Sequence, residues 1–524
     1  MRAAFDEFFP NKQIEKSMLP LLSNLLSLGS AGLVDRGKIR DSYLSTQGIT
    51  FTLSGKERPL SVDLVPRVIH AGEWEIISAG VKQRIKALEL FLADVYGEQG
   101  VIRDGVVPRQ LITSSEHFLR EAYGIHPANG VRIHVAGIDL IRDEAGQLRV
   151  LEDNLRCPSG VSYVLENRRT LAHVVPEIFS NFQVRSVEEY PEHLLNALRA
   201  AAPDGVVEPT VAILTPGIHN SAHFEHAFLA RRMGIELVEG RDLFCKGGYL
   251  YMRTTGGPMP VHVLYRRIDD EFLDPMQFKP DSILGVPGIL NVARAGNVTL
   301  ANAVGNGVAD DKAIYPYVPK LIRYYLDEEP ILPNVETFDL QDPDVLSHVK
   351  KNLAEMVVKP VAGSGGYGLV IGPKATAQEL SDISKVISEN PRGWIAQPVV
   401  NLSTCPTVLA DGEVAPRHID LRPFAVNDGK EIWVLPGGLT RVALVEGSLV
   451  VNSSQGGGSK DTWVLADGSE SKRSKKREIK EISIESETIE VPVLADREVG
   501  PEVLTSTRLK QQEEQQQQEL GSTC

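Results

Sequence analysis

The stretch Met356-Val-Val-Lys-Pro-Val-Ala-Gly-Ser-Gly-Gly-Tyr-Gly-Leu-Val-Ile371 decides the fold, because it places a glycine-rich loop between two apolar, strand-like segments. Glycines have no side chains, so the backbone of such a loop can wrap closely around an anionic group and direct N–H groups at it. Lys359 stands on the incoming strand, just before the loop. The loop residues expected to bind are Gly363, Ser364, Gly365, Gly366 and Gly368.

Three common glycine-rich motifs do not fit this segment. Gly363-x-Gly365-x-x-Gly368 has the spacing of the dinucleotide fingerprint, but that motif needs a helix after the glycines, and residues 369–373 look like a strand. A Walker loop needs a terminal Gly-Lys-Ser/Thr, which does not follow here. In protein kinases the lysine comes after the loop, and this chain contains neither HRD nor DFG. A glycine-rich hairpin without any ligand stays open as the alternative.

A second group of polar residues lies on a predicted hairpin over residues 131–154. If the turn holds two or four residues, Arg142 pairs with Gln147, and three polar side chains further along point to one face. These are Asp139, Glu152 and Asn154. Two carboxylates and an amide oxygen are suitable ligands for Mg²⁺. For this motif taken alone, a solvated acidic strand end is the alternative.

The composition excludes several classes of protein. The chain has 524 residues, 42% of them hydrophobic and 24% charged, as is usual for globular proteins. A net charge of −14 argues against a general nucleic-acid binder, which needs a concentrated basic surface. The four cysteines lack CxxC spacing and suit a reducing compartment. The acidic N-terminus does not resemble a secretory signal, and no apolar run approaches the ~18 residues of a membrane span, so we expect a cytoplasmic protein without membrane contact.

The periodicity of apolar residues predicts an α/β and α+β multidomain chain. Helical spacing covers residues 80–96, and residues 210–265 alternate strand, helix, strand and strand, which is typical of a small domain with a parallel sheet. A further helix is expected at 311–328. Residues 356–464 are rich in predicted strands, with one helix near 377–388.

A lysine before a flexible glycine loop, combined with Asp-x12-Glu-x-Asn on a hairpin, is the combination found in ATP-grasp proteins. Here the hairpin precedes the loop in sequence, so the chain resembles the circularly permuted ATP-grasp family, type 2, whose relatives include the synthetase part of glutathionylspermidine synthase. The resemblance extends from about Gly37 to Leu465. It also rests on Ser61-Val-Asp-Leu-Val-Pro-Arg67, Phe224-Glu-His-Ala-Phe-Leu-Ala-Arg231, Tyr265-Arg-Arg-Ile-Asp-Asp270 and Asn452-Ser-Ser-Gln-Gly-Gly-Gly-Ser-Lys-Asp461.

The resemblance implies a circularly permuted ATP-grasp fold with an added small α/β domain. From residue 466 onward the chain is rich in charged residues and glutamine and almost free of aromatics, so we expect a disordered tail with no chemical role. The expected units are 1–125 (N-terminal α+β region), 126–205 (metal-binding hairpin), 206–310 (small α/β domain), 311–465 (nucleotide-binding region) and 466–524 (tail).

The resemblance also implies how ATP would be held. Lys359 would contact the α- and β-phosphates, while the glycine loop covers the triphosphate. A second, earlier lysine is usual in the family, and Lys320 is preferred over Lys312 for this role. The adenine would meet the backbone of Gln397, Pro398 and Val399, and Mg²⁺ would be bound by Asp139, Glu152 and Asn154.

Two arginines are the expected catalytic residues. Arg422 would face the transferring phosphoryl group, where a guanidinium stabilises developing negative charge, and Arg441 is the second candidate. Ordinary surface ion pairs are the alternative for both.

The function implied by the resemblance is that of an ATP-dependent ligase. It would join a small-molecule or peptide carboxylate to an amine through an acyl phosphate, with Mg²⁺ and ATP as cofactors. Two alternatives remain open at the level of sequence. One is a phosphotransferase that stops after phosphoryl transfer, and the other is a nucleotide-binding scaffold without ligase activity.

Overall fold

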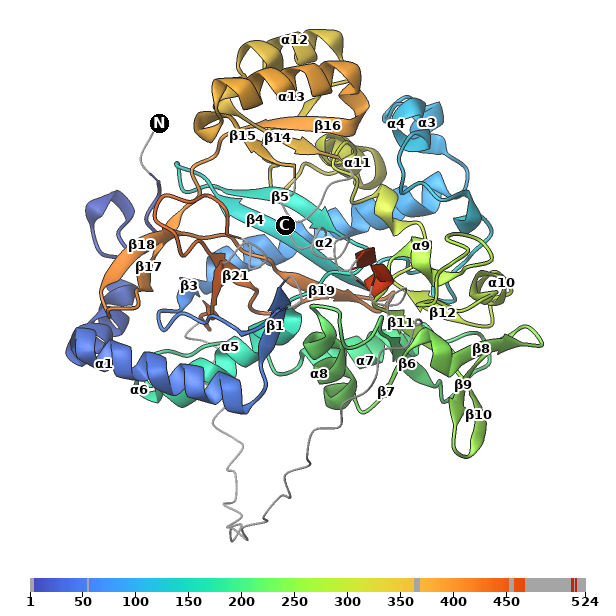
Figure 1. Ribbon diagram of the computed structural model, residues 1–524, viewed down its shortest axis with the longest axis horizontal. Helices are drawn as coiled ribbons and strands as arrows, with labels where there is room; N and C mark the ends of the chain where they lie inside the picture. Colours follow the sequence, from blue (N-terminus) through green and yellow to red (C-terminus); the bar gives the residue numbers. More distant parts are fainter. Residues whose placement is uncertain are drawn as a thin grey trace, which may run out of the picture.

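The computed structural model describes residues 4–53, 56–361, 368–451, 457–466, 510–512 and 514–515. Helices and several small sheets form a mixed α/β fold, as predicted (Figure 1). A unit of two helices on a small sheet projects at the top of the view.

The predicted hairpin lies in the middle of the molecule, as part of an antiparallel sheet with strand order β20-β19-β4-β5. The strands are β4 (Val135–Arg142), β5 (Leu148–Asn154), β19 (Phe424–Asn427) and β20 (Ile432–Val434). Strands from both sides of the glycine loop in sequence therefore share one sheet. The long helix α2 (Ala71–Val95) packs on β20 and on helix α11 (Val318–Leu326).

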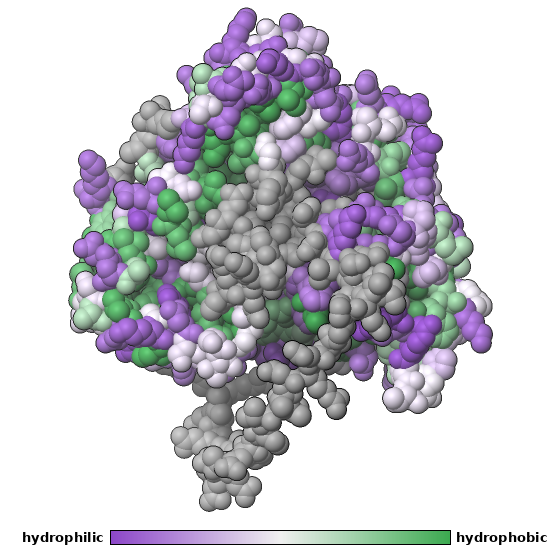
Figure 2. Space-filling model, viewed as in Figure 1, coloured by the Kyte–Doolittle hydropathy of each residue, from purple (hydrophilic) through white to green (hydrophobic). Residues whose placement is uncertain are grey.

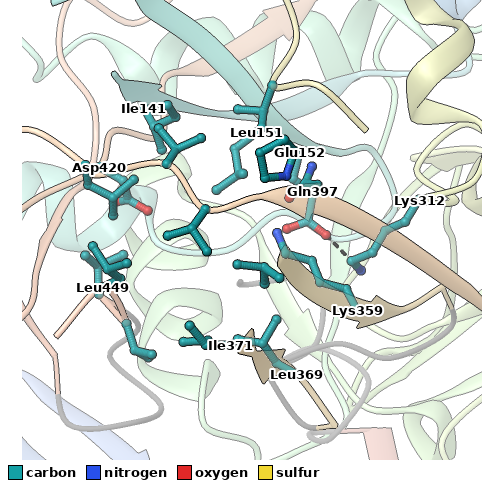
Figure 3. A pocket seen from close by; sticks show the side chains of 18 of the residues that line it. Ile141, Leu151, Glu152, Lys312, Lys359, Leu369, Ile371, Gln397, Asp420 and Leu449 are labelled. Atoms are coloured by element: carbon teal, nitrogen blue, oxygen red, sulfur yellow. Dashed lines mark ion pairs between the residues drawn. The ribbon is translucent and has the colours of Figure 1, made fainter. Parts of the chain in front are cut away.

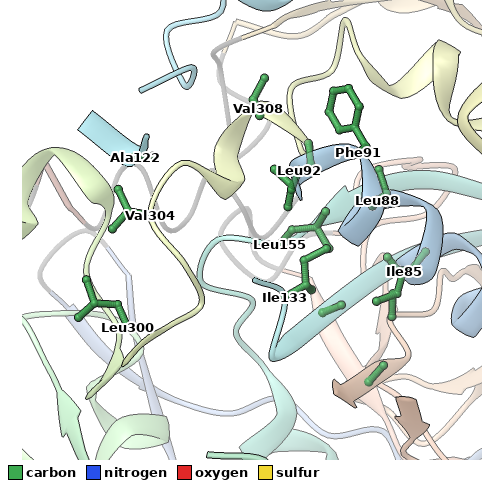
Figure 4. Packing of buried hydrophobic residues seen from close by; sticks show 14 of the residues in the cluster. Ile85, Leu88, Phe91, Leu92, Ala122, Ile133, Leu155, Leu300, Val304 and Val308 are labelled. Carbon is green, nitrogen blue, oxygen red and sulfur yellow. The ribbon is translucent and has the colours of Figure 1, made fainter. Parts of the chain in front are cut away.

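Helix α2 forms because its apolar residues recur at helical spacing, so that one face is continuously hydrophobic. That face is buried: Leu88, Phe91 and Leu92 are fully enclosed. In the same cluster, Ile133 and Leu155 border the hairpin strands (Figure 4). This packing fixes the hairpin from behind and leaves part of its other face to the cavity described below.

The predicted parallel sheet is present, with strand order β12-β11-β6-β7 and parallel pairing throughout. Its strands are β6 (Val211–Leu214), β7 (Glu236–Val238), β11 (Val263–Arg266) and β12 (Thr299–Ala301). Helix α8 (His223–Met233) connects β6 to β7 and ends at Gly234, whose φ of 66° is a conformation that favours glycine. A small antiparallel sheet lies beside this one, made of β8 (Leu243–Lys246), β9 (Tyr249–Thr254) and β10 (Gly257–Pro260).

The upper unit carries the glycine-rich segment. Its sheet has the order β13-β16-β14-β15, with β13 (Phe338–Asp339), β14 (Met356–Pro360), β15 (Val370–Ile371) and β16 (Trp394–Pro398). Helices α12 (Pro343–Lys351) and α13 (Ala377–Glu389) cover it, and a capping box between Thr376 and Glu379 starts α13. Figure 2 shows a hydrophilic outer face on this unit, with hydrophobic residues below it where the sheet meets the rest of the molecule.

Two details of the predicted elements are wrong. Arg142 pairs with Leu148 rather than with Gln147, and a β-bulge between Asp139 and Leu140 then shifts the register. The helix expected at 311–328 is shorter, because α11 begins only at Val318 after a 3₁₀ turn. Prolines at 316 and 319 explain this start, since proline is favoured in a first helical turn but cannot donate a hydrogen bond further in.

The remaining elements surround the sheets. They are α1 (Leu19–Thr46), α5 (Val161–Val174), α6 (Pro176–Phe179), α7 (Tyr190–Ala200), β1 (Thr50–Leu53), β2 (Lys56–Pro59), β3 (Arg67–Ile69), β17 (Thr404–Val408), β18 (Val414–His418), β21 (Thr440–Val442), β22 (Gly458–Lys460) and β23 (Thr462–Val464), with the short helices α3 (Gly100–Arg103), α4 (Arg109–Thr113), α9 (Asp270–Leu273) and α10 (Ile289–Arg294). Contrary to expectation, one helical stretch, Lys16–Thr46, is long and apolar enough to cross a membrane by length and composition alone. The core helix of a soluble protein and a signal sequence also meet this criterion.

Five residues of the expected tail beyond residue 466 are described by the structure. Residues 510–512 and 514–515 are helical, and Gln511, Gln512 and Gln515 are buried. The rest of the expected tail, 467–509, 513 and 516–524, lies outside the described residues.

Candidate functional site

A cavity lies between the hairpin sheet and the upper unit. Its empty space is about 1030 Å³, part of it open to solvent. Leu151 and Glu152 line it from β5, and Val357 and Lys359 line it from β14 (Figure 3). The fold therefore brings Glu152 of the hairpin and the lysine before the glycine loop to the same cavity, as the family resemblance implies.

Three charged side chains meet in this cavity. Lys312 Nζ lies 2.9 Å from Glu152 Oε1, and these two side chains are 16% and 11% exposed. Lys359 enters from β14, and all three residues also line a smaller cavity next to the first (Figure 3). Two ammonium groups facing one apolar-walled space are suited to a polyanion such as a triphosphate.

Lys320, the preferred earlier lysine, does not line the cavity. Lys320 lies on α11, and its ammonium is 5.0 Å from the centre of the Tyr317 ring, a cation–π contact. Lys312 precedes α11 and reaches the cavity instead. Spacing along the sequence cannot separate these two lysines, because the start of the helix decides which one faces inward.

The residues expected to bind Mg²⁺ are only partly together. Because of the bulge, Asp139 is directly opposite Glu152 and Gly137 is opposite Asn154, so the three polar side chains do share a face. Asn154 is buried, and its Nδ2 donates to the Gly137 carbonyl at 3.2 Å. Only Glu152 lines the cavity.

Asp139 is bound by two arginines instead of facing the cavity. Arg422 donates to both of its carboxylate oxygens, at 2.5 and 2.8 Å, and Arg441 Nη2 donates to Oδ2 at 2.7 Å. Asp139 is fully buried. Burial alone would raise the pKa of Asp139, but the two guanidiniums outweigh it and hold that pKa below its usual value. The side chain anchors both arginines in this structure, and its expected role as a metal ligand stays a prediction.

The two expected catalytic arginines are placed differently. Arg441 lines the cavity and also contacts Asp420, another lining residue. Arg422 is fully enclosed and does not line the cavity. Position therefore favours Arg441 as the arginine that can face a ligand, and the catalytic role of both residues stays a prediction. The cluster holds two carboxylates, of Asp139 and Asp420, and two guanidiniums, of Arg422 and Arg441. Burial raises the pKa of Asp420, and Arg441 opposes this rise.

The expected adenine-binding segment lies on the cavity wall. Gln397, Pro398 and Val399 all line it. The side chain of Gln397 donates to Thr337 Oγ1 at 2.8 Å, and the Val399 N–H donates to the Glu355 carbonyl at 3.1 Å. Carbonyl groups of this segment would accept hydrogen bonds from a base, and the N–H of the neighbouring Val400, which also lines the cavity, would donate one.

The glycine loop itself is described only at its end. Gly363, Ser364, Gly365 and Gly366 lie outside the described residues. Gly368 has a φ of 75°, a left-handed conformation that strains other residues. Strands β14 and β15 on either side are paired antiparallel, so the predicted strand–loop–strand arrangement is confirmed.

The sequence did not predict one further charged group, formed by Arg156, Asp269 and Asp310. Arg156 Nε lies 3.1 Å from Asp310 Oδ2, and Arg156 Nη1 lies 3.8 Å from Asp269 Oδ1. Asp310 lines the smaller cavity beside Glu152, and burial raises its pKa to about 6 despite Arg156. The segment Tyr265–Asp270 carries the resemblance and so contained a signal, but sequence offers no way to pair Asp269 with Arg156.

The residues fit a nucleotide better than a metal held by protein alone. Within the ranges that the structure describes, no three His, Cys, Asp or Glu side chains are grouped to hold a metal ion. Mg²⁺ often takes one or two carboxylates and completes its shell with substrate phosphates. Glu152, with Asn154 on the same face, fits such a shared site beside the lysines.

This site and the strand–loop–strand unit define an ATP-grasp protein. The family model described as "Circularly permuted ATP-grasp type 2" matches residues 66–443, and the chain belongs to that family.

The chain is also similar to individual proteins. The chain is 60% identical to an uncharacterized protein of Mycobacterium tuberculosis (strain ATCC 25618 / H37Rv) over 464 residues, which cover 88% of this chain and 84% of the relative. It is 44% identical over 447 residues to a protein of Frankia alni provisionally named glutamate–cysteine ligase 2-3, covering 85% of this chain but 52% of that one. In fold it resembles the apo form of a glutathione synthetase-like effector from Globodera pallida, with a TM-score of 0.54, 11% identity and coverage of 83% of this chain and 97% of that one.

Proposed function

We propose that this protein is an ATP-dependent carboxylate–amine ligase that forms an amide or peptide bond through an acyl phosphate. The observation that supports this most is the meeting of Glu152, Lys312 and Lys359 in one cavity, from segments far apart in sequence. Membership of the ATP-grasp family supports an ATP-dependent ligase in general terms. The substrates and the individual steps are part of the proposal.

The charged side chains of the cavity would bind the triphosphate. Lys312 and Lys359 would pair with phosphate oxygens, and Lys312 would exchange its present partner, Glu152, for them. Glu152 and Asn154 would hold Mg²⁺, which supplies charge neutralisation between the phosphates when bound. Apolar side chains of the wall, among them Leu369 and Ile371, would enclose the base.

Arg441 would stabilise the phosphoryl group during transfer. It is the arginine on the cavity wall, and Asp139 and Asp420 fix its position from behind. A guanidinium held in this way needs little reorganisation when negative charge develops. Asp139 and Arg422 are therefore positioning residues in this proposal.

The chemistry would proceed in two steps. A carboxylate oxygen of the substrate would attack the terminal phosphorus of ATP, giving an acyl phosphate and ADP. The amine would then attack the acyl carbon, and the C–O bond to phosphate would break, leaving an amide and inorganic phosphate. The chain's contribution is the fixed placement of charge and reactants.

The substrates are proposed only as a class. The Frankia relatives are named as glutamate–cysteine ligases, which join two amino acids. This chain matches about half of their length. We infer that both substrates of this chain are amino acids or peptides, one supplying the carboxylate and the other the amine.

Incubation of the full chain with ATP, Mg²⁺ and pooled amino acids, peptides and polyamines tests the proposal. Release of phosphate and a product whose mass equals the two substrates minus water would support it. Lys359→Met should abolish both signals, whereas Lys320→Met, which removes a lysine outside the cavity, should not. Phosphorylated product without amide would identify a phosphotransferase instead, and the absence of any turnover would favour the scaffold.

A further inference from the structure

The parallel sheet has a topological switch point between β6 and β11. The chain leaves β6 toward β7 on one side, and later returns to place β11 and β12 on the other side. In open parallel sheets, ligands bind in the crevice outside the carboxyl ends of the strands at such a point. Here those ends are Thr215 and Pro216 after β6, and Arg267 to Asp270 after β11.

The described tail residues occupy this crevice. Gln512 Nε2 donates to the Pro216 carbonyl, and the Asp269 N–H donates to Gln515 Oε1 at 2.8 Å. The short helical piece lies beside β11 and α9 in Figure 1. A segment from the far end of the chain thus bridges the ends of the two strands that flank the switch point.

The contacts depend on side-chain amides. Gln511 accepts from the Ile283 N–H at 2.8 Å and donates to the Asp281 carbonyl, so one amide uses both of its functions on the backbone. Gln512 also acts as a donor. A carboxylate in either place could not donate and would face a carbonyl oxygen, so these two positions select glutamine over glutamate. Glu514 forms an ion pair with Lys279.

The crevice adjoins the nucleotide cavity. Asp269, which binds Gln515, is 3.8 Å from Arg156, and Arg156 is 3.1 Å from Asp310 on the wall of the smaller cavity. Among the described residues, Asp269 Oδ2 and Asp310 Oδ1 are buried without a hydrogen-bond partner. The bound segment therefore leaves two acceptors unsatisfied between the crevice and the smaller cavity, where a ligand with more donors would bind better.

We propose that the switch-point crevice is a binding site for glutamine-bearing peptides, and that residues 510–512 and 514–515 of the same chain occupy it until such a peptide displaces them. Its position makes it the peptide-substrate site of the ligase, and this assignment rests on the proposed function. The binding site itself does not depend on that function.

A fluorescent peptide with the sequence of residues 505–520 tests the proposal by anisotropy, without ATP. The parent chain should bind it weakly, since a tethered segment competes at an effective concentration that can reach the millimolar range. The full chain with Gln511→Glu and Gln512→Glu should bind it at least tenfold more tightly. Lys510→Ala, which changes an exposed residue of the same segment, should behave like the parent.

A charge reversal controls for damage to the fold. We call the chain with Gln511→Glu and Gln512→Glu the vacated chain. Adding Lys279→Glu to it should abolish binding of the peptide, and a peptide carrying Glu514→Lys should restore binding. Equal affinity of parent and vacated chains, or a charge reversal that is not rescued, would overturn the proposal. If peptide binding to the parent instead changed with protein concentration, the occupant would be the tail of a second copy, and the assignment to the same chain would be wrong. Because no nucleotide is present, these outcomes do not depend on ligase activity.

Discussion

Replacing Asp139 with Asn separates a structural role of this carboxylate from a metal-binding one. The side chain accepts three hydrogen bonds from two guanidiniums at 2.5, 2.8 and 2.7 Å and is fully buried. Asn keeps the shape but replaces one acceptor oxygen with an NH₂ group that faces a guanidinium. Arg422 and Arg441 would then share only the charge of Asp420.

Removal of one partner from a buried ion pair costs about 3–5 kcal/mol, because the remaining charge is left uncompensated. We expect Asp139→Asn to lower the free energy of unfolding by this amount. Urea unfolding can be followed through the fluorescence of the buried Trp74 and Trp463, with an unchanged slope as evidence of an unchanged fold. Glu152→Gln should cost only about 1 kcal/mol, since Lys312 stays in contact with the cavity.

The opposite pattern would refute this reasoning. If Asp139→Asn unfolded at the same urea concentration as the parent but needed much more Mg²⁺ for activity, Asp139 would be a metal ligand. Its arginine contacts would then be a resting arrangement that ATP and metal replace.

Three other predictions concern the cavity. Lys359→Met should weaken ATP binding by about 10- to 100-fold, as expected for the loss of one charged hydrogen bond, and leave adenosine binding nearly intact. If calorimetry gave equal ATP affinities for the variant and the parent, Lys359 would not be a phosphate ligand. Lys312→Met should weaken ATP binding in the same way while Lys320→Met does not, and the reverse result would restore Lys320 as the earlier lysine. Glu152→Asp should reduce activity steeply, with partial rescue by excess Mg²⁺ or by Mn²⁺, because the shorter side chain cannot reach a ligand distance near ~2.1 Å; an unaltered metal dependence would contradict this.

Local patterns predicted the parts of the fold that depend on local chemistry. The strand–glycine–strand segment, the alternation after residue 210 and the helix at 377–389 follow from periodicity and turn residues. Glu152 and Lys359 could be brought together only through the family resemblance, since nothing in their own neighbourhoods links them.

The errors have physical reasons that a single sequence does not carry. The bulge at Asp139 is a property of strand pairing, and the arginines that neutralise Asp139 come from strands far away in sequence. The tail was expected to be disordered because it is almost free of aromatic residues and rich in charged residues and glutamine. Its described part instead binds through side-chain amides on backbone groups, a contact that hydrophobic pattern does not register.

Glu7 should contribute to the loss of stability at acid pH. This carboxylate is buried and accepts hydrogen bonds from Arg67, Arg142 and Ser403, the closest at 2.6 Å from Arg67. Burial would raise the pKa of Glu7, but the two arginines outweigh it and lower the pKa from 4.5 to about 2. At 1.36 kcal/mol per pH unit, this shift corresponds to about 3 kcal/mol of stability, present above pH 4.5 and lost as the pH falls toward 2.

The parent should therefore lose about 1.4 kcal/mol through Glu7 between neutral pH and pH 3.5, because the unfolded chain then binds a proton that the folded chain does not. Glu7→Gln should be less stable at pH 7 by about 3 kcal/mol, and its deficit should shrink as the pH falls. Glu116→Gln, at an exposed site, should run parallel to the parent. A constant gap between parent and Glu7→Gln from pH 7 to 3.5 would contradict the assignment. Because Arg142 ends strand β4 and Ser403 follows the cavity residue Leu402, protonation of Glu7 should loosen the base of the nucleotide cavity, and ATP affinity should decline over the same pH range.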